Sequence, residues 1–203
     1  MQIGIVASGP SATAEDAKKL SEVCDQVIDI NDSWRLCRNG SGEFVNDHIY
    51  GTDMKWWKYA LADIMRDFDG ELWTQRVQWN EEPEKLGINC LESSIDPDIC
   101  TEPGKIHTGS NSGYAAINLA YHLSATNHLS ATTIVLLGYD MGMDGNRRHW
   151  FNDRPQELNV DSNYNDFMRQ LATIDTKKHG IEILNASRRT ALNCFPLVDL
   201  EDL

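Results

Sequence analysis

The chain has 203 residues, which is enough for one domain with a full hydrophobic core, and no shift in composition indicates a second domain. Its 18 Lys and Arg are outnumbered by 31 Asp and Glu, which gives a formal charge of -13 at pH 7. A surface of this charge repels phosphate backbones and anionic lipids, so the composition argues against non-specific nucleic-acid binding and against a membrane partner.

Cysteine usage and the first residues indicate the compartment. The five cysteines are odd in number, widely spaced and free of a CxxC pair, so they predict neither a zinc site nor a disulfide framework. The opening stretch, MQIGIVASGP, lacks the basic start and long apolar run of an export signal. We therefore expect a cytoplasmic protein in a bacterial or viral setting, with its oligomeric state left open.

Apolar runs and helical patterns alternate along the chain. Strands are expected at residues 3–7, 26–30, 48–51, 71–74, 133–138 and 180–184, and helices at residues 12–23, 53–67, 112–124 and 162–178. Residues 3–7 and 133–138 are apolar at nearly every position, which is typical of central parallel strands covered on both faces. We predict an α/β protein, a Rossmann-like open and mainly parallel sheet with helices on both faces, formed by residues 1–203 as a single nucleotide-binding domain.

Residues 78–105 break this alternation. They contain Pro83, Pro97 and Pro103, many acidic side chains and little periodicity. A long segment without a regular pattern is typical of a functional loop. We interpret residues 78–105 as an excursion or lid-like insertion outside the core of the sheet.

Small, polar or acidic residues follow nearly every expected strand. In open parallel sheets, ligands bind beyond the carboxyl ends of the strands, where loops lead into helix N-termini. The loops after expected strands are residues 8–11, 31–33, 52–53 and 139–142, and residues 108–113 lead from the end of the irregular segment into a helix. They are predicted to meet on one edge of the sheet and to form a ligand site there.

The turn at residues 8–11 has two interpretations. Gly9 permits close backbone approach, Pro10 fixes φ and Ser11 can cap the next helix, so a capped joint explains these residues taken alone. The turn matches neither a Walker loop nor G-x-G-x-x-G. Beside the other polar strand ends, residues 8–11 become one wall of a nucleotide site.

Two later loops contain groups suited to anions. Thr108-Gly109-Ser110-Asn111-Ser112-Gly113 precedes a helix, so its free N–H groups and the helix dipole suit a phosphate or carboxylate, although capping alone is the alternative. In residues 136–155, Arg147, Arg148 and His149 combine cations with a titratable imidazole, which suits a phosphate leaving group and a proton acceptor. Arginines paired with nearby acids are the alternative there. No metal site is predicted, because Asp140 and Asp144 lie in a glycine-rich loop with weak ligand spacing.

The order of short motifs along the chain resembles the bacterial sialyltransferases of glycosyltransferase family 42. The motifs are IVASGPS, VIDIND, YGTD, TGSNSGYAAINLA, IVLLGYDM and HGIEILNAS followed by LNCF. They are also similar to the surrounding superfamily, with its motility-associated factor glycosyltransferases and pterin pyrophosphokinases, and most of all to small phage-type proteins with GPS, ND and HWF motifs. The resemblance covers most of the chain except residues 78–105 and the termini.

This resemblance implies a Rossmann-like domain that binds a nucleotide-activated sugar without a metal or any further cofactor. The implied donor contacts, with the strand-end residues added from the loops above, are Ser8, Gly9, Pro10, Ser11, Asn31, Asp32, Thr52, Asp53, Asn111, Ser112, Gly113, Tyr139, Asp140, Arg147 and Arg148. The chain departs from the family in two places. Arg147, Arg148 and His149 stand where the family has phosphate-binding tyrosines, and Asp161-Ser162 stands where it has a catalytic histidine.

We therefore expect a single displacement in which His149 deprotonates an acceptor hydroxyl, with Asp161 as the second choice of base. Arg147, Arg148 and the helix that begins at Ser112 would stabilise the departing phosphate. Two alternatives stay open. One is a Mg²⁺-dependent pyrophosphokinase or nucleotidyltransferase of the same fold, with ligands among Asp32, Asp53, Asp140 and Asp144, and the other is a protein that sequesters a nucleotide without turnover.

Overall fold

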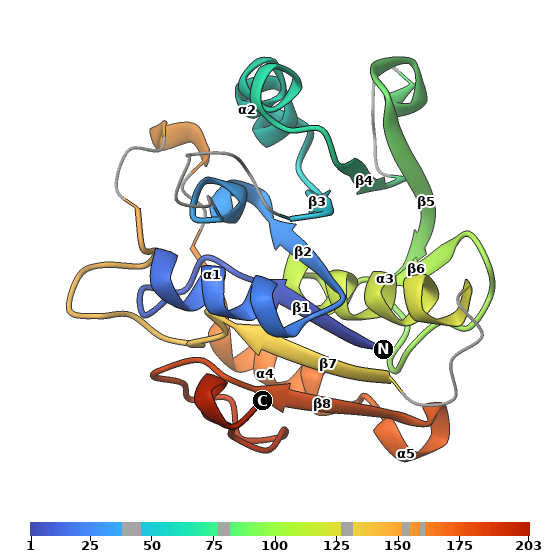
Figure 1. The fold of residues 1–203 in the computed structure, drawn as a ribbon. Helices are drawn as coiled ribbons and strands as arrows, with labels where there is room; N and C mark the ends of the chain where they lie inside the picture. The colour runs from blue at the N-terminus through green and yellow to red at the C-terminus, as the bar shows by residue number, and fades with distance from the viewer. Residues whose placement is uncertain (38–45, 77–81, 127–131, 152–154, 159–160) are drawn as a thin grey trace.

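One parallel β-sheet forms the centre of the molecule (Figure 1). A computed structural model describes residues 1–37, 46–76, 82–126, 132–151, 155–158 and 161–203. Its eight strands lie in the order β6-β5-β4-β3-β2-β1-β7-β8, and every neighbouring pair is parallel. The strands are β1 (Gln2–Val6), β2 (Gln26–Ile30), β3 (His48–Tyr50), β4 (Glu71–Gln75), β5 (Ile88–Ser94), β6 (Lys105–His107), β7 (Thr132–Leu137) and β8 (Ile181–Asn185).

Helices cover both faces of this sheet, which confirms the predicted Rossmann-like α/β class. They are α1 (Ala14–Val23), α2 (Met54–Asp67), α3 (Ser112–Thr126), α4 (Tyr164–Leu171) and α5 (Thr176–His179), with short 3-10 turns at Asn31–Arg35, Pro83–Leu86, Gln156–Leu158 and Leu200–Asp202. None of the helices in the described part of the chain is long and apolar enough to cross a membrane.

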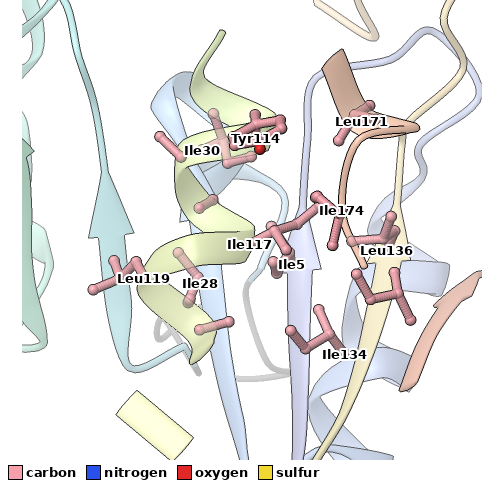
Figure 2. Packing of buried hydrophobic residues seen from close by; sticks show 14 of the residues in the cluster. Ile5, Ile28, Ile30, Tyr114, Ile117, Leu119, Ile134, Leu136, Leu171 and Ile174 are labelled. Atoms are coloured by element: carbon pink, nitrogen blue, oxygen red, sulfur yellow. The ribbon is translucent and has the colours of Figure 1, made fainter. Parts of the chain in front are cut away.

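The central strands alternate their side chains between two apolar layers. Ile5, Ile28 and Ile134 face α3 and pack around Ile117, as Figure 2 shows. Val6, Val135 and Leu137 face the opposite side and pack with Ala17 and Leu20 of α1. Because both faces are buried, an apolar residue is favoured at every position of β1 and β7, which is why these runs are readable from the sequence.

The prediction for residues 78–105 is wrong in the part that the structure describes. Residues 78–81 lie outside the described residues, but β5 and β6 extend the sheet beyond β4 instead of leaving it as a lid. The prolines lie outside both strands, since Pro83 begins a 3-10 turn and Pro97 and Pro103 lie in the connection from β5 to β6. At this edge of the sheet β5 alternates irregularly between buried and exposed residues, so it lacks the continuous apolar run of a central strand.

The single helix expected at residues 162–178 is two helices. α4 ends at Leu171, and the Thr173 backbone N–H donates to the Gln170 carbonyl, three residues earlier, at 2.9 Å instead of continuing the α-helical spacing of four. Asp175 then caps α5 by accepting the Lys178 N–H at 3.0 Å. Asp175 therefore starts a new helix by capping it. Helical periodicity alone does not show that a side chain within the pattern caps a second helix instead of continuing the first.

Asp29 on β2 is a fully buried carboxylic acid. It accepts the Asn46 amide N–H at 2.7 Å and the Cys37 thiol at 3.3 Å, and burial raises its pKa from 3.8 to about 7. Between pH 4 and pH 7 the folded protein therefore holds a proton at Asp29 that the unfolded chain has lost, so this group contributes less stability as pH rises.

Asp29→Asn is expected to remove that loss, because Asn keeps an acceptor for Asn46 and carries no charge. The variant and the wild type should unfold at similar temperatures at pH 4, and the variant should be more stable at pH 8, by an amount on the order of a few kcal/mol. Thermal unfolding from pH 4 to pH 8 measures this difference. Parallel profiles for the two proteins would contradict a raised pKa at Asp29.

Candidate functional site

A pocket of about 360 Å³ opens at the carboxyl ends of β1, β2, β3 and β7, at the place where the strand order reverses direction around β1. This is the position that open parallel sheets use for ligands, and the volume falls in the range of small-molecule sites. The pocket lining consists of Ala7, Ser8, Gly9, Ile30, Asn31, Thr52, Asp53, Ser110, Asn111, Ser112, Gly113, Gly138, Tyr139, Asp140, Met141, Gly142, Arg148, His149, Leu158, Ser162, Tyr164 and Phe167.

Most of the predicted site residues meet in this pocket. Those that line it are Ser8, Gly9, Asn31, Thr52, Asp53, Asn111, Ser112, Gly113, Tyr139, Asp140, Arg148 and His149. Those that lie outside its lining are Pro10, Ser11, Asp32, Arg147 and Asp161. The sequence pattern therefore predicted the edge of the sheet at which this pocket opens, and the residues outside the lining are described with their partners below.

The turn after β1 is fastened to the loop after β7. The Gly9 N–H donates to the Gly138 carbonyl at 3.0 Å, and the Ser11 N–H and hydroxyl each donate to the Asp140 carboxylate at 2.8 Å. Burial raises the pKa of Asp140, an effect that the two bonds from Ser11 partly offset. Ser8 and Gly9 thus form part of the pocket wall, and Ser11 supports that wall from outside the lining, so the turn is both a joint between two loops and a pocket wall.

The loop before α3 brings the helix N-terminus to the pocket. Gly109 (φ 48°) and Ser110 (φ 57°) adopt the left-handed conformation, which turns the chain sharply into the helix. Asn111 then acts as the cap, because its side-chain oxygen accepts the Tyr114 N–H at 2.8 Å.

The first turn of α3 forms part of the pocket lining. The hydroxyls of Ser112 and Thr52 lie 3.0 Å apart, which joins α3 to the end of β3. The Tyr139 hydroxyl donates to the Gly113 carbonyl at 2.9 Å, and a Cβ on Gly113 would approach the Tyr139 ring within 2.9 Å. The lack of a side chain at Gly113 therefore keeps the helix backbone, with the positive end of its dipole, at the pocket.

The loop after β7 is clipped across the β1 turn at several points. Asp144 and Arg147 pair in a tight hairpin, and the Arg147 guanidinium donates to the Pro10 carbonyl at 3.0 Å while it also binds the Asp144 carboxylate at 3.0 Å. The Trp150 N–H donates to the Ser8 carbonyl at 3.3 Å. Arg147 therefore holds this loop in place from outside the pocket lining.

His149 is held by the same carbonyl. Its Nδ1 lies 3.3 Å from the Ser8 oxygen, and its ring stacks on Phe151 with 5.1 Å between centroids and 13° between planes. A carbonyl oxygen only accepts, so this contact requires a proton on Nδ1, and in the neutral form of the ring Nε2 is then the basic nitrogen. A side chain fixed in this tautomer is suited to accept a proton.

Of the charged residues Arg148 and Asp161, Arg148 lines the pocket and Asp161 lies in solvent. Arg148 lines the pocket and its guanidinium lies 2.6 Å from the Asp161 carboxylate, whose side chain is 91% exposed. Asp161 thus partly balances the charge of Arg148 from the solvent side. Asp161 lies outside the pocket lining and His149 lies in it, so His149 is the better placed of the two predicted bases.

The acids considered as magnesium ligands have other partners or positions. Asp32 is buried and accepts the Trp56 indole N–H at 3.2 Å, and Asp144 lies between Arg147 and Arg189. Across the described residues, no group of three or more His, Cys, Asp or Glu side chains is placed to hold a metal ion.

A second hollow, of about 500 Å³, lies between α1 and the C-terminal segment. It is the larger of the two, but its charged walls are paired among themselves. Arg188 binds Asp16 at 2.6 Å, and Lys19 pairs with Glu201. We therefore regard the pocket at the carboxyl ends of the strands as the candidate site, because it brings together the helix terminus, an arginine and an oriented imidazole.

Sequence reasoning missed one wall of the pocket. Tyr164 and Phe167 lie three residues apart on α4 and line the pocket beside Ser162, Met141 and Leu158. The available signal was an aromatic pair on one face of a helix that directly follows the loop with His149. Helical periodicity predicts a helix over residues 162–178 but does not show which of its faces lines a pocket.

The geometry defines the class of the protein as an open parallel α/β protein with a small-molecule pocket at the carboxyl edge of its sheet. Comparison with known family models, with curated proteins and with solved structures gives no match for the chain.

Proposed function

We propose that the protein is a metal-independent glycosyltransferase that transfers a sugar from a nucleotide-activated donor to a hydroxyl acceptor. The observation that carries the proposal is the meeting of three features in one pocket: the N-terminus of α3, the Arg148 side chain and the His149 imidazole, whose Nδ1 faces the Ser8 carbonyl. The motif order that resembles glycosyltransferase family 42 supports the same activity class.

Each feature has a role in a displacement at the anomeric carbon. Nε2 of His149 takes the proton of the acceptor hydroxyl as the acceptor oxygen bonds to the anomeric carbon. The bond from that carbon to the donor phosphate oxygen breaks, and the electron pair leaves on the phosphate. Arg148 and the dipole of α3 stabilise the negative charge that develops on the leaving group.

Arg148 and Asp161 form a site that a phosphate can enter by exchange. The Arg148 side chain is 40% exposed and the Asp161 side chain is 91% exposed, so the ion pair between these two groups is weak in water. A donor phosphate, which has a higher negative charge than a carboxylate, would take the place of Asp161 beside the Arg148 guanidinium.

The test is a panel of nucleotide sugars with simple hydroxyl acceptors, in which released nucleotide is measured with and without excess chelator. Release that survives chelation supports the proposal. Loss of release on chelation favours the magnesium-dependent transfer, and recovery of unchanged ligand after long incubation identifies a sequestering protein.

Arg148→Ala is expected to weaken nucleoside diphosphate binding by about tenfold to a hundredfold, the loss for one charge-assisted contact to phosphate. Arg66→Ala is the matched control, because Arg66 is an exposed arginine paired with Asp63 and Asp67 at the far end of α2. Calorimetric titration of the three proteins measures both effects. Equal affinities for Arg148→Ala and wild type would place the phosphate elsewhere.

A further inference from the structure

The two aromatic rings of α4 are set apart from the hydrophobic core. Tyr164 and Phe167 are both partly exposed, and their rings meet edge to face with centroids 6.4 Å apart. Within the described residues, neither ring belongs to the hydrophobic clusters or packs against them, whereas Met168 on the same helix does. Core packing therefore explains Met168 and leaves the two rings unexplained.

The position of Tyr164 and Phe167 on α4 makes their rings available to a ligand in the pocket. Both side chains line the pocket, next to Met141 and Leu158, and α4 packs against α3. Another part of the lining is polar, with Asn31, Thr52 and Asp53 at the ends of β2 and β3. The pocket thus combines a helix N-terminus, whose dipole suits an anion, with two aromatic side chains.

We infer that Tyr164 and Phe167 form a stacking platform for the base of the nucleotide, an inference that rests on the proposed function. A ligand that satisfies both parts of the pocket must have a phosphate and a flat aromatic ring in one molecule, and nucleotides are the common metabolites with both. Recognition by the face of the base tolerates different bases, because every base has a π-face. The same wall would discriminate against sugar phosphates, which lack an aromatic ring.

The experiment is a set of titrations with UDP, ADP, ribose 5-phosphate and inorganic pyrophosphate. Phe167→Leu and Tyr164→Leu keep an apolar side chain on α4 and remove the ring. Each is expected to lower the affinity for UDP and ADP by about tenfold and to leave ribose 5-phosphate and pyrophosphate unchanged. Tyr59→Leu is the matched control, since Tyr59 is a 40% exposed aromatic on α2 outside the pocket lining.

Three outcomes overturn the inference and can be told apart. If UDP and ADP bind wild type and ring variants equally, the platform is wrong and the proposed function stands. If ribose 5-phosphate loses affinity as strongly as the nucleotides, the rings contact the sugar instead of the base. If the wild type binds pyrophosphate but neither nucleotide better, or binds none of these ligands, the nucleotide site fails and the platform fails with it. Circular dichroism of each variant confirms that α4 is intact.

Discussion

A His149→Asn variant is expected to bind a nucleoside diphosphate as well as the wild type does and to turn over a nucleotide sugar about a hundredfold to ten-thousandfold more slowly. The Asn amide N–H takes the place of Nδ1–H, so the hydrogen bond to the Ser8 carbonyl is retained. The basic Nε2 is lost. Binding and the position of the loop should therefore survive while proton transfer fails.

The measurement separates kcat from the dissociation constant of the nucleotide. His122→Gln is the matched control, because the His122 Nε2 donates to the Lys105 carbonyl at 2.8 Å and the Gln amide can replace that contact away from the pocket. The control should retain normal turnover. Full turnover in His149→Asn would remove His149 from the role of base, and a loss of binding together with turnover would make it a positioning residue.

Gly9→Ala is expected to destabilise the protein by about 3 kcal/mol and to disrupt the pocket wall. A Cβ at this position would lie 2.3 Å from both the Gly138 carbonyl oxygen and the Asp140 carboxylate. The carbonyl belongs to the backbone of the loop after β7 and the carboxylate is fixed by Ser11, so neither can move aside without breaking the joint. At this chain length the loss corresponds to a fall in Tm of about 6–12 °C.

Gly142→Ala is the control for Gly9→Ala. Gly142 lines the same pocket, but a Cβ there would meet its nearest atom, the Asp140 carbonyl oxygen, only at 3.8 Å. The control should unfold within a degree or two of the wild type. An unchanged Tm for Gly9→Ala would show that the turn after β1 and the loop after β7 are not closely packed.

The central strands and the start of α2 are predictable because short stretches of sequence contain their signals. The apolar runs of β1 and β7 follow from burial on both faces of the sheet. Asp53 marks the start of α2, because its carboxylate caps that helix by accepting the Lys55 N–H at 2.8 Å. β5 is not predictable from an apolar run, because a strand near the edge of the sheet is only partly buried. Its pairing with β4 is a long-range fact that no local pattern contains.

The candidate site shows the same division. Gly9 is predicted from its place after a strand, and Ser112 and Gly113 from the small polar residues that lead into a helix; the topology of the sheet brings them together. Arg147 and Asp32 could not be separated from pocket residues by sequence, because their partners, the Pro10 carbonyl and the Trp56 indole, are distant in the chain. A charge in a loop predicts an interaction, while its partner depends on the folded structure.

The most direct test of a nucleotide site at the carboxyl edge of the sheet is a titration of ¹⁵N-labelled protein with UDP and ADP, followed by amide chemical shifts. We predict saturable shifts at Gly9, Asn31 and Gly113, which line the pocket. Shifts confined to Arg188 and Leu200, in the hollow beside α1, would contradict this assignment, as would the lack of any shift at millimolar nucleotide.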